Sequence, residues 1–316
     1  EADVKKSEVS IRQFIEHCKC ESTSRVAPWL NCGTDAEGAE LLCRCTLDGI
    51  VSNDVKSVYP EAAAYLSIET VFGEAELEDY FREYRQLKMT NRLTQEFCEQ
   101  AKKVLIPPSV QTRDVILQQY SSDNECALLV VDAMGAEWLP MIVTKARELN
   151  FCVELVQVVK AQLPTMTEFN QLFWAATERR LPDIKRFDNI AHHGEETHEP
   201  RRPEENLFAL LDLIGSKVLP RVAEGLARFE RVLVTADHGS SRLAALAWQS
   251  ESKFARTLEC IDGGVIADWR YRERAQEGEC PPEMEETLDG KYWVVRGYNR
   301  LPKQGGGQGF EFHGGA

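Results

Sequence analysis

Short apolar runs alternate with amphipathic stretches over the second half of the chain. ALLVVD at 127–132 is followed by AEWLPMIVTKAREL and then FCVELVQVV, and LFALLDLIGSKVLPRVAEGL precedes RVLVTAD. Apolar runs of this length predict buried strands, and the stretches between them have helical spacing. A strand, helix, strand order favours right-handed βαβ units. The predicted fold class is therefore α/β, with a mostly parallel sheet flanked by helices.

The first third of the chain has a different pattern. In LEDYFREYRQLKMTNRLTQEFCEQAKKVL, apolar side chains recur every three or four residues, which predicts amphipathic helices. Ile106-Pro107-Pro108 then interrupts the pattern, because proline lacks a backbone donor and restricts the residue before it. We predict a helical N-terminal domain over 1–106, a linker and connecting helix over 107–124, and a further domain over 125–316.

Composition narrows the class of protein. The 316 residues are 43% hydrophobic and 28% charged, as in ordinary globular proteins, and no run approaches the roughly 18 apolar residues that a membrane helix needs. The net charge of −14 disfavours indiscriminate binding to nucleic acid, although divalent metals can reverse the local sign in a cleft. We expect a cytoplasmic protein without a membrane contact. Because the chain begins at Glu1 without Met, we also expect it to be a piece of a longer protein.

The cysteines allow two interpretations. Five of the ten lie early in the chain, at positions 18, 20, 32, 43 and 45, and form two C-x-C pairs. Such a group could hold a structural zinc ion, but C-x-C matches known zinc knuckles less well than C-x-x-C. Buried free thiols are the simpler interpretation.

Candidate metal ligands stand at the ends of two predicted strands. Asp132 ends the strand in ALLVVDAMGAEW, and Asp237-His238 end the strand in VLVTADHGSSR. Ligands of open α/β sheets bind where strands end and loops begin, so these side chains are expected to converge on one cleft. Carboxylate and imidazole groups are common zinc ligands. The pattern indicates a metalloenzyme.

The loop KAQLPTMTEF contains two threonines whose hydroxyl groups are candidates for the site. Thr165 and Thr167 lie near the start of a predicted helix, where free backbone N–H groups favour an anion. Ordinary helix capping by a threonine is the alternative. Arg242 in the TADHGSSR turn and Lys160 before the threonine loop are candidates for contact with a substrate phosphate, and solvent-facing charges are the alternative for both.

Taken together, VVDAMGAEW, LPTMTE, FDNIAHHG, VTADHGSSRLA and the terminal FHGGA resemble, in this order, the PglZ-type branch of the alkaline phosphatase superfamily. That branch is found in bacteriophage-defence systems of the BREX kind. The resemblance covers 127–316, and the helical part upstream is similar only faintly, through YRQLKMTNRLTQEF. It implies an alkaline-phosphatase-like sheet and a metal-dependent catalytic domain.

The resemblance also implies two sets of ligands for two divalent metal ions, usually Zn²⁺, with Mn²⁺ as the alternative. One set is Asp132, Thr167, Asp237 and His238, with Thr167 as ligand and nucleophile. The other set is Asp188, His192 and His313. Thr165 is the alternative nucleophile, and His193 and His198 are alternatives to His192.

The leading hypothesis is a metal-dependent phosphodiesterase with a phosphothreonine intermediate. Its substrate would be DNA or a nucleotide-like phosphodiester, and its partners other phage-defence proteins. A hydroxyl beside a divalent cation is activated as a nucleophile, while a second cation stabilises the leaving oxygen. A metal-stabilised scaffold in a defence complex is the first alternative, and a phosphomonoesterase of the same superfamily is the second.

Overall fold

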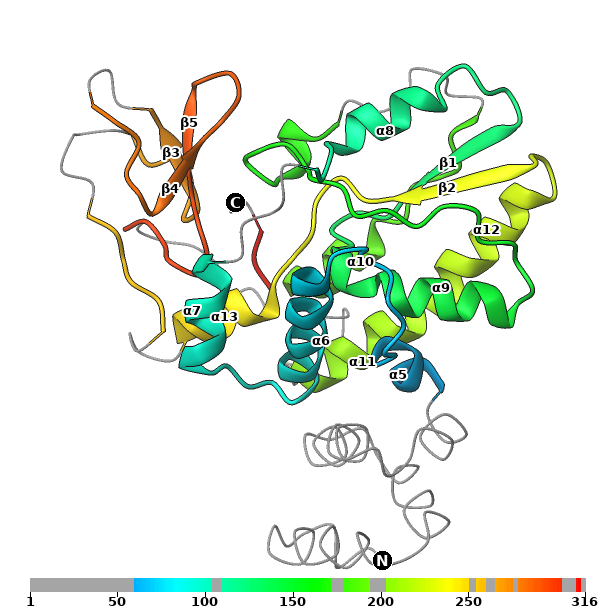
Figure 1. Ribbon diagram of the computed structural model, residues 1–316, viewed down its shortest axis with the longest axis horizontal. Coiled ribbons are helices and arrows are strands. Elements are labelled where there is room, and N and C mark those ends of the chain that lie inside the picture. Colours follow the sequence, from blue (N-terminus) through cyan, green and yellow to red (C-terminus); the bar gives the residue numbers. More distant parts are fainter. Residues whose placement is uncertain are drawn as a thin grey trace, which may run out of the picture.

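The computed structural model describes residues 60–103, 109–171, 179–193, 203–249, 254–259, 265–274, 278–302 and 311–313. Two strands, β1 (Cys126–Val130) and β2 (Arg231–Thr235), form a parallel pair in register from Cys126 and Arg231 to Val130 and Thr235. Helix α8 (Arg113–Gln119) covers one face of the pair, and α9 (Leu139–Glu148) and α12 (Leu219–Leu226) lie on the other (Figure 1). The predicted α/β class with a parallel pair is confirmed.

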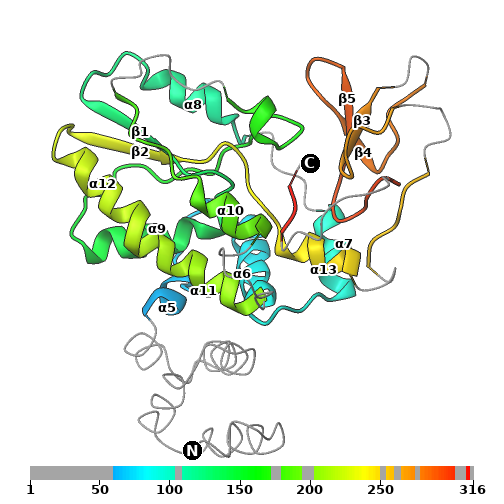
Figure 2. The same cartoon turned by 180° about the vertical axis from the view of Figure 1, so that it is seen from behind.

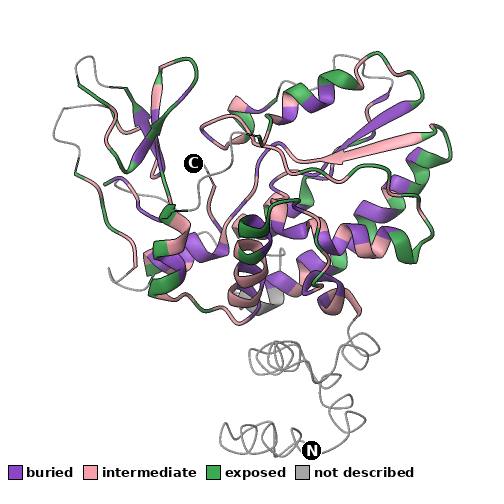
Figure 3. Cartoon of the chain, viewed as in Figure 1, coloured by how far each residue is buried: buried purple, intermediate pink, exposed green. Residues whose placement is uncertain are grey.

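Strand β1 is buried on both faces because its side chains alternate. Ala127 and Leu129 point into the larger hydrophobic core with Trp138 and Met141. Leu128 and its neighbours two residues away contact Leu117 of α8 on the opposite face. Figure 3 shows β1 buried along its length, whereas β2 is only partly covered. A strand buried on both faces needs a continuous apolar run, which is why CALLVV is apolar throughout.

The larger core also contains the helices below the sheet. They are α10 (Arg186–His193), α11 (Pro203–Leu213) and the π-helical turn Ile214–Val218 that leads into α12, as the reverse view in Figure 2 also shows. The predicted helix AEWLPMIVTKAREL is a short 3₁₀ turn, Ala136–Trp138, followed by α9. A second 3₁₀ turn covers Thr167–Phe169. Helices α9, α11 and α12 overlap the stretches that the sequence predicted to be helical.

The sheet is smaller than the sequence predicted. FCVELVQVV at 151–159 was expected to be a strand, but this stretch forms no strand and is partly exposed. Lys160, which follows this stretch, forms a parallel bridge with Thr112. A third extended segment, 180–184, follows β1 through the bridges Leu128–Arg180 and Val131–Ile184. A full alkaline-phosphatase-like sheet is not seen in the described part of the chain.

Before α8, the described residues form the helices α5 (Pro60–Tyr65), α6 (Ala75–Met89) and α7 (Gln95–Lys103). The predicted amphipathic pattern of α6 and α7 is confirmed, and α5 packs against α9. Helices α6 and α7 share a second hydrophobic core with α13 (Arg242–Gln249) and Tyr298. The helical part and the later part of the chain therefore have common cores across residue 106, and the predicted division into domains stays a prediction.

A small antiparallel sheet lies apart from β1 and β2 (Figure 1). Its strands are β3 (Tyr271–Glu273), β4 (Met284–Glu286) and β5 (Tyr292–Val295), in the order β3-β5-β4. Trp293 and Val295 form its core with Met284 and Leu301. None of the helices in the described ranges combines the length and the apolar character needed to cross a membrane.

Candidate metal centre

Asp132 lies just beyond the end of β1. Its backbone N–H donates to the carbonyl oxygen of Ile184 at 3.1 Å, which ties the turn to the neighbouring extended segment. Ala133 then has φ of 60°, in the left-handed region that residues other than glycine rarely adopt. This bend points the N–H of Ala133 at Oδ1 of Asp237, 3.1 Å away. The end of β1 is thereby joined to the end of β2.

Asp237 and His238 follow β2 in a buried turn, each with 3% exposure. Asp237 Oδ1 also accepts the N–H of His238 at 2.9 Å. Gly239 lies against Gly135 so closely that a Cβ on Gly239 would be 2.9 Å from the Cα of Gly135. The two ligand-bearing turns therefore meet through a glycine contact that leaves no space for a side chain.

Thr167 approaches this pair from a separate loop. Its Oγ1 lies 2.8 Å from Asp237 Oδ2 and 3.0 Å from His238 Nε2. His238 Nδ1 lies 3.2 Å from the carbonyl oxygen of Gly239, which can only accept, so Nδ1 carries the proton and Nε2 offers its lone pair to the site. The distance from His238 Nε2 to Asp132 Oδ1 is 3.7 Å. We call Asp132, Thr167, Asp237 and His238 the Thr167 group.

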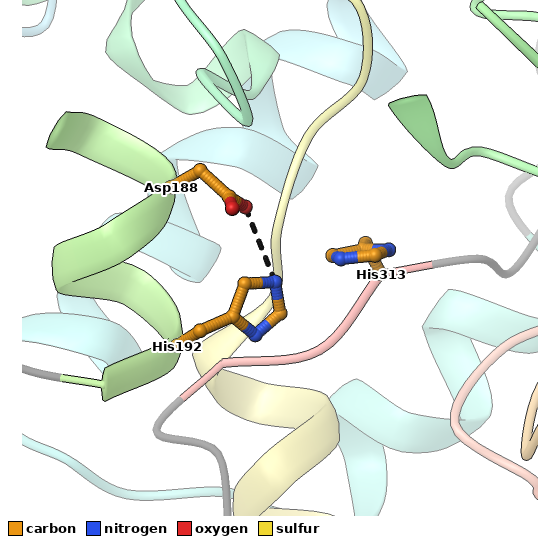
Figure 4. A group of neighbouring side chains, drawn as sticks. All are labelled: Asp188, His192 and His313. Carbon is orange, nitrogen blue, oxygen red and sulfur yellow. Dashed lines mark ion pairs between the residues drawn. The ribbon is translucent and has the colours of Figure 1, made fainter. Parts of the chain in front are cut away.

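Asp188 and His192 lie on α10, four residues apart and therefore on one face of the helix. His192 Nε2 lies 3.1 Å from Asp188 Oδ1. Figure 4 shows both side chains pointing toward His313, which comes from the segment 311–313. The rings of His192 and His313 are 4.6 Å apart. We call Asp188, His192 and His313 the His313 group.

The segment that carries His313 is held by backbone hydrogen bonds on both sides. The N–H of Glu311 donates to the carbonyl oxygen of Ala191 on α10 at 2.9 Å. Phe312 pairs with Ser241, just after the Asp237-His238 turn, through bonds of 2.8 and 3.1 Å. These contacts bring His313 next to the Thr167 group, with its ring 4.5 Å from that of His238.

Two sets of side chains are close enough to share a metal ion. Ligand atoms of Asp188, His192 and His313 all lie within 4.8 Å of one another, and so do those of Asp132, Asp188 and His238. Four ligands around a zinc ion at about 2.1 Å lie about 3.4 Å apart, which resembles the spacings within the Thr167 group. All seven predicted ligands thus come together, although they originate from five separate segments of the chain.

The electrostatics also favour a bound cation. Burial raises the pKa of Asp132 to about 7, and the carboxylates of Asp237 and Asp188 add to the effect. Burial also raises the pKa of Asp188, but the hydrogen bond and charge of His192 bring it below its usual value. Burial and the neighbouring His238 and His192 lower the pKa of His313 to about 3. His313 is therefore a neutral imidazole at neutral pH, the form that binds metal.

Several buried ligand atoms of the cluster have no hydrogen-bond partner among the described residues. Oδ1 of Asp132 and Nδ1 of His313 are among them. Buried polar atoms are almost always paired in native proteins, so atoms left over in a cluster of carboxylates and imidazoles indicate a ligand. The residues present fit divalent metal ions.

The remaining predicted residues lie in different settings. Arg242 is buried and its Nε donates to Oδ1 of Asn91 at 2.9 Å. Lys160 is partly buried, and its backbone pairs with 111–113. Contact of either side chain with phosphate stays a prediction, as does the choice between Thr167 and Thr165. The side chain of His193, His198 and the early cysteines lie outside the described residues.

Sequence reasoning missed a buried ion cluster beside the His313 group. Lys88 Nζ lies 2.7 Å from Glu311 and 3.3 Å from Glu137, and all three side chains are at most 5% exposed. Glu311 also accepts the hydroxyl of Ser240 at 2.6 Å. Glu137 is thus a buried member of an ion cluster. The available signal was the position of Lys88 on the apolar face of α6, at helical spacing from Leu77 and Tyr84.

Comparison of the chain with protein-family models, with curated proteins and with solved structures finds no match.

Proposed function

We propose that the protein is a metal-dependent phosphodiesterase that uses Thr167 as its nucleophile. The observation that carries this proposal is the position of the Thr167 hydroxyl, 2.8 Å from Asp237 and 3.0 Å from His238, beside a second group of ligands. A nucleophilic hydroxyl within hydrogen-bonding distance of buried metal-ligand types is the arrangement that phosphoryl transfer to a side chain requires.

The ligands divide by group. Asp132, Thr167, Asp237 and His238 would hold one divalent ion, and Asp188, His192 and His313 the other. When bound, the ions would favour loss of the Thr167 proton and stabilise the charge that develops on the leaving oxygen. Zinc suits this set of nitrogen and oxygen ligands, and Mn²⁺ is the alternative.

The protein residues prepare the hydroxyl for attack. Asp237 accepts the hydrogen bond of Thr167 Oγ1 and orients the oxygen. A bond forms between Oγ1 and phosphorus while the bond from phosphorus to the leaving oxygen breaks, which yields a phosphothreonine. Water then breaks this ester and restores Thr167. Because Thr167 is exposed while Asp237 and His238 are buried, a phosphate could reach the hydroxyl from outside.

The proposed substrate class is DNA or another nucleotide-like phosphodiester. Support comes from the PglZ-like motifs, whose residues Asp132, Thr167, Asp237 and His238 lie together as that resemblance implies. The same resemblance supports a role in a phage-defence assembly, and a cytoplasmic location is part of this proposal. The alkaline-phosphatase-like fold is part of this proposal.

The test compares hydrolysis of bis-p-nitrophenyl phosphate and p-nitrophenyl phosphate by protein supplied with Zn²⁺ or Mn²⁺. We expect faster turnover of the diester, abolished by Thr167→Ala and by Asp237→Ala and retained by Thr165→Ala. Faster turnover of the monoester would indicate a phosphomonoesterase. Tight binding of two metals without any turnover would contradict the enzyme and favour a metal-stabilised scaffold.

A further inference from the structure

The start of α8, expected from sequence to be only a connecting segment, contacts both loops of the Thr167 group. Thr112 pairs with Lys160 in a parallel bridge, and the N–H of Arg113 donates to the carbonyl oxygen of Lys160 at 2.9 Å. This pairing places two charged side chains, Arg113 and Asp114, between the threonine loop and the turn after β2. Neither residue belongs to the predicted ligand set.

Arg113 binds the turn that carries Asp237. Its Nη1 donates to the carbonyl oxygens of Asp237 at 2.9 Å and Ala236 at 3.3 Å. Both carbonyls lie beyond the end of β2, where strand pairing has stopped. Arg113 is 2% exposed, so its hydrogen bonds are shielded from competing water. It therefore holds the backbone of Asp237 through the carbonyl oxygen and not through the ligand atoms of the side chain.

Asp114 extends the contact to the threonine loop. Its Oδ1 accepts from Nε and Nη2 of Arg113 at 3.0 and 2.8 Å. Its Oδ2 accepts from Nε2 of Gln162 at 2.6 Å. One carboxylate is thus shared between the Arg113 side and the loop that ends in Thr167.

Asn170 completes the path from Gln162 to Thr167. Its Oδ1 accepts the N–H of Gln162 at 2.8 Å, and its Nδ2 donates to the carbonyl oxygens of Gln162, Pro164 and Met166 at 3.0 to 3.2 Å. Asn170 is fully buried. Asn170 therefore closes the loop on itself and ties it to Gln162.

We propose that Arg113 and Asp114 are positioning residues that set Thr167 relative to Asp237 and His238. They act through the Asp237 carbonyl on one side and through Gln162 on the other, and they touch neither substrate nor metal. The proposal rests on the proposed function only where it gives the spacing between Thr167 and Asp237 a role in catalysis. The physical link between the two loops stands on the contacts themselves.

Arginine is needed at position 113 because the contact is a fork. One guanidinium reaches two carbonyl oxygens and one carboxylate at the same time, whereas the ammonium of lysine is a point charge without that planar geometry. Arg113→Lys keeps the charge and removes the geometry. Asp114→Asn keeps an oxygen that can accept from Arg113, and it removes the negative charge of the carboxylate that accepts from Gln162.

A matched control is Arg179, a second buried arginine that donates to backbone carbonyls. Its partners are the carbonyl oxygens of Tyr120, Ser121, Asp123 and Cys126, at the opposite end of β1 from Asp132. Arg179→Lys therefore disturbs a similar set of contacts far from the site. Comparing it with Arg113→Lys separates an effect on positioning from a general loss of stability.

The first measurement is hydrogen exchange of the metal-free protein, which needs no activity. In Arg113→Lys we expect peptides covering 162–170 and 236–240 to exchange about 10-fold faster or more, as loss of one charged hydrogen bond implies. In Arg179→Lys these peptides should be unchanged while 121–126 exchanges faster. Should Arg113→Lys not fold, Asp114→Asn is expected to accelerate 162–170 alone.

The second measurement is Zn²⁺ affinity by competition with a chromophoric chelator. Arg113→Lys should bind the ion of the Thr167 group about 10- to 100-fold more weakly, a usual effect of residues behind metal ligands. Unchanged exchange at 162–170 and 236–240, or an equal loss of affinity in Arg179→Lys, would overturn the proposal. A wild-type protein that binds zinc and hydrolyses no phosphodiester would reject the proposed function instead, and the exchange result would still decide the positioning role.

Discussion

The two ligand groups are built in different ways. The Thr167 group takes Asp132, Asp237 and His238 from the ends of two paired strands, which backbone hydrogen bonds hold in register. The His313 group takes two residues from one face of α10 and one from a short segment far along the chain. Its neighbour is the buried ion cluster of Lys88, Glu137 and Glu311. A strand end is positioned by the sheet, whereas a distant segment needs added contacts of its own.

The difference indicates that the sheet holds the Thr167 group in place, whereas the position of the His313 group depends on added contacts between distant segments. Asp237 receives hydrogen bonds from Ala133, His238 and Thr167, all from turns next to the sheet or its loops. His313 depends on the pairing of Phe312 with Ser241 and of Glu311 with Ala191. We therefore expect substitutions in the Thr167 group to affect chemistry most, and those near the His313 group to affect stability and retention of one metal.

The largest expected effect is that of Asp237→Ala on activity. This change removes a proposed metal ligand and the acceptor of the Thr167 hydroxyl together, so we expect diester turnover to fall on the order of 10⁴-fold, as for a central member of a catalytic set. The measurement is the rate with bis-p-nitrophenyl phosphate at saturating Zn²⁺.

His192→Ala provides the comparison within the second group. It removes one ligand of the His313 group without touching Thr167, so added Zn²⁺ should recover more of its activity than that of Asp237→Ala. Equal losses of activity in the two variants, unchanged by excess zinc, would contradict this difference between the Thr167 group and the His313 group.

Lys88→Met is expected to have the next largest effect, on stability. It leaves the Glu137 and Glu311 carboxylates buried without a cation, which typically costs about 3–5 kcal/mol. Because Glu311 is two residues from His313, the variant should also retain less of one metal. Urea denaturation and the metal content by mass spectrometry measure these two consequences.

Lys145→Met is the control for this substitution. Lys145 pairs with Glu61 and Glu148, both at 3.3 Å, but its side chain is 13% exposed and both partners reach water. Pairs of this kind contribute about 1 kcal/mol or less. If both variants lose the same small free energy of unfolding, the buried cluster does not stabilise the His313 group.

The last effect concerns the dependence of stability on pH, and it has opposite signs in the two groups. Asp132 titrates near 3.8 when unfolded and about 7 in the metal-free fold, so the folded state binds more protons in this window and stability falls as pH rises. His313 titrates near 6.5 when unfolded and about 3 when folded, so the folded state binds fewer protons and stability falls as pH falls.

Two variants separate these contributions. With EDTA present, Asp132→Asn should gain stability over the wild type as pH rises from about 4 to 7, and His313→Gln should gain as pH falls from about 6.5 to 3. Urea denaturation at several pH values measures both. Asp289→Asn, at an exposed residue, should run parallel to the wild type above about pH 4.5. Parallel curves for all three variants would contradict the burial effects.

The sequence predicted those features that are local in the chain. An apolar run that stops at Asp132, and another at Asp237-His238, indicate strand ends because a buried strand must be apolar up to its edge. Helices α6, α8 and α9 follow from apolar spacing in the same way. The stretch 151–159 was misjudged because apolar residues predict burial but do not supply a hydrogen-bonded neighbour.

The contacts that connect distant segments could not be predicted from one sequence. Arg113 and the Asp237 carbonyl are 124 positions apart, and a carbonyl leaves no trace in residue type. Glu137 and Lys88 are residue types that usually lie on the surface, and only the packing of the fold shows that these two are buried. His313 was found through the resemblance of FHGGA rather than through any pattern of burial. Local periodicity thus reveals ligands on strand ends, while their supporting contacts need the fold.

The contact between Gly239 and Gly135 limits which residues can stand at position 239. Since even one carbon at 239 would meet the backbone of the facing turn at 2.9 Å, a randomised library should return only glycine there. Gly215, in the π-helical turn, has nothing within 4 Å of its would-be Cβ and should accept many residues. Transfer of this site to another scaffold would therefore require the two glycines in addition to the seven proposed ligands.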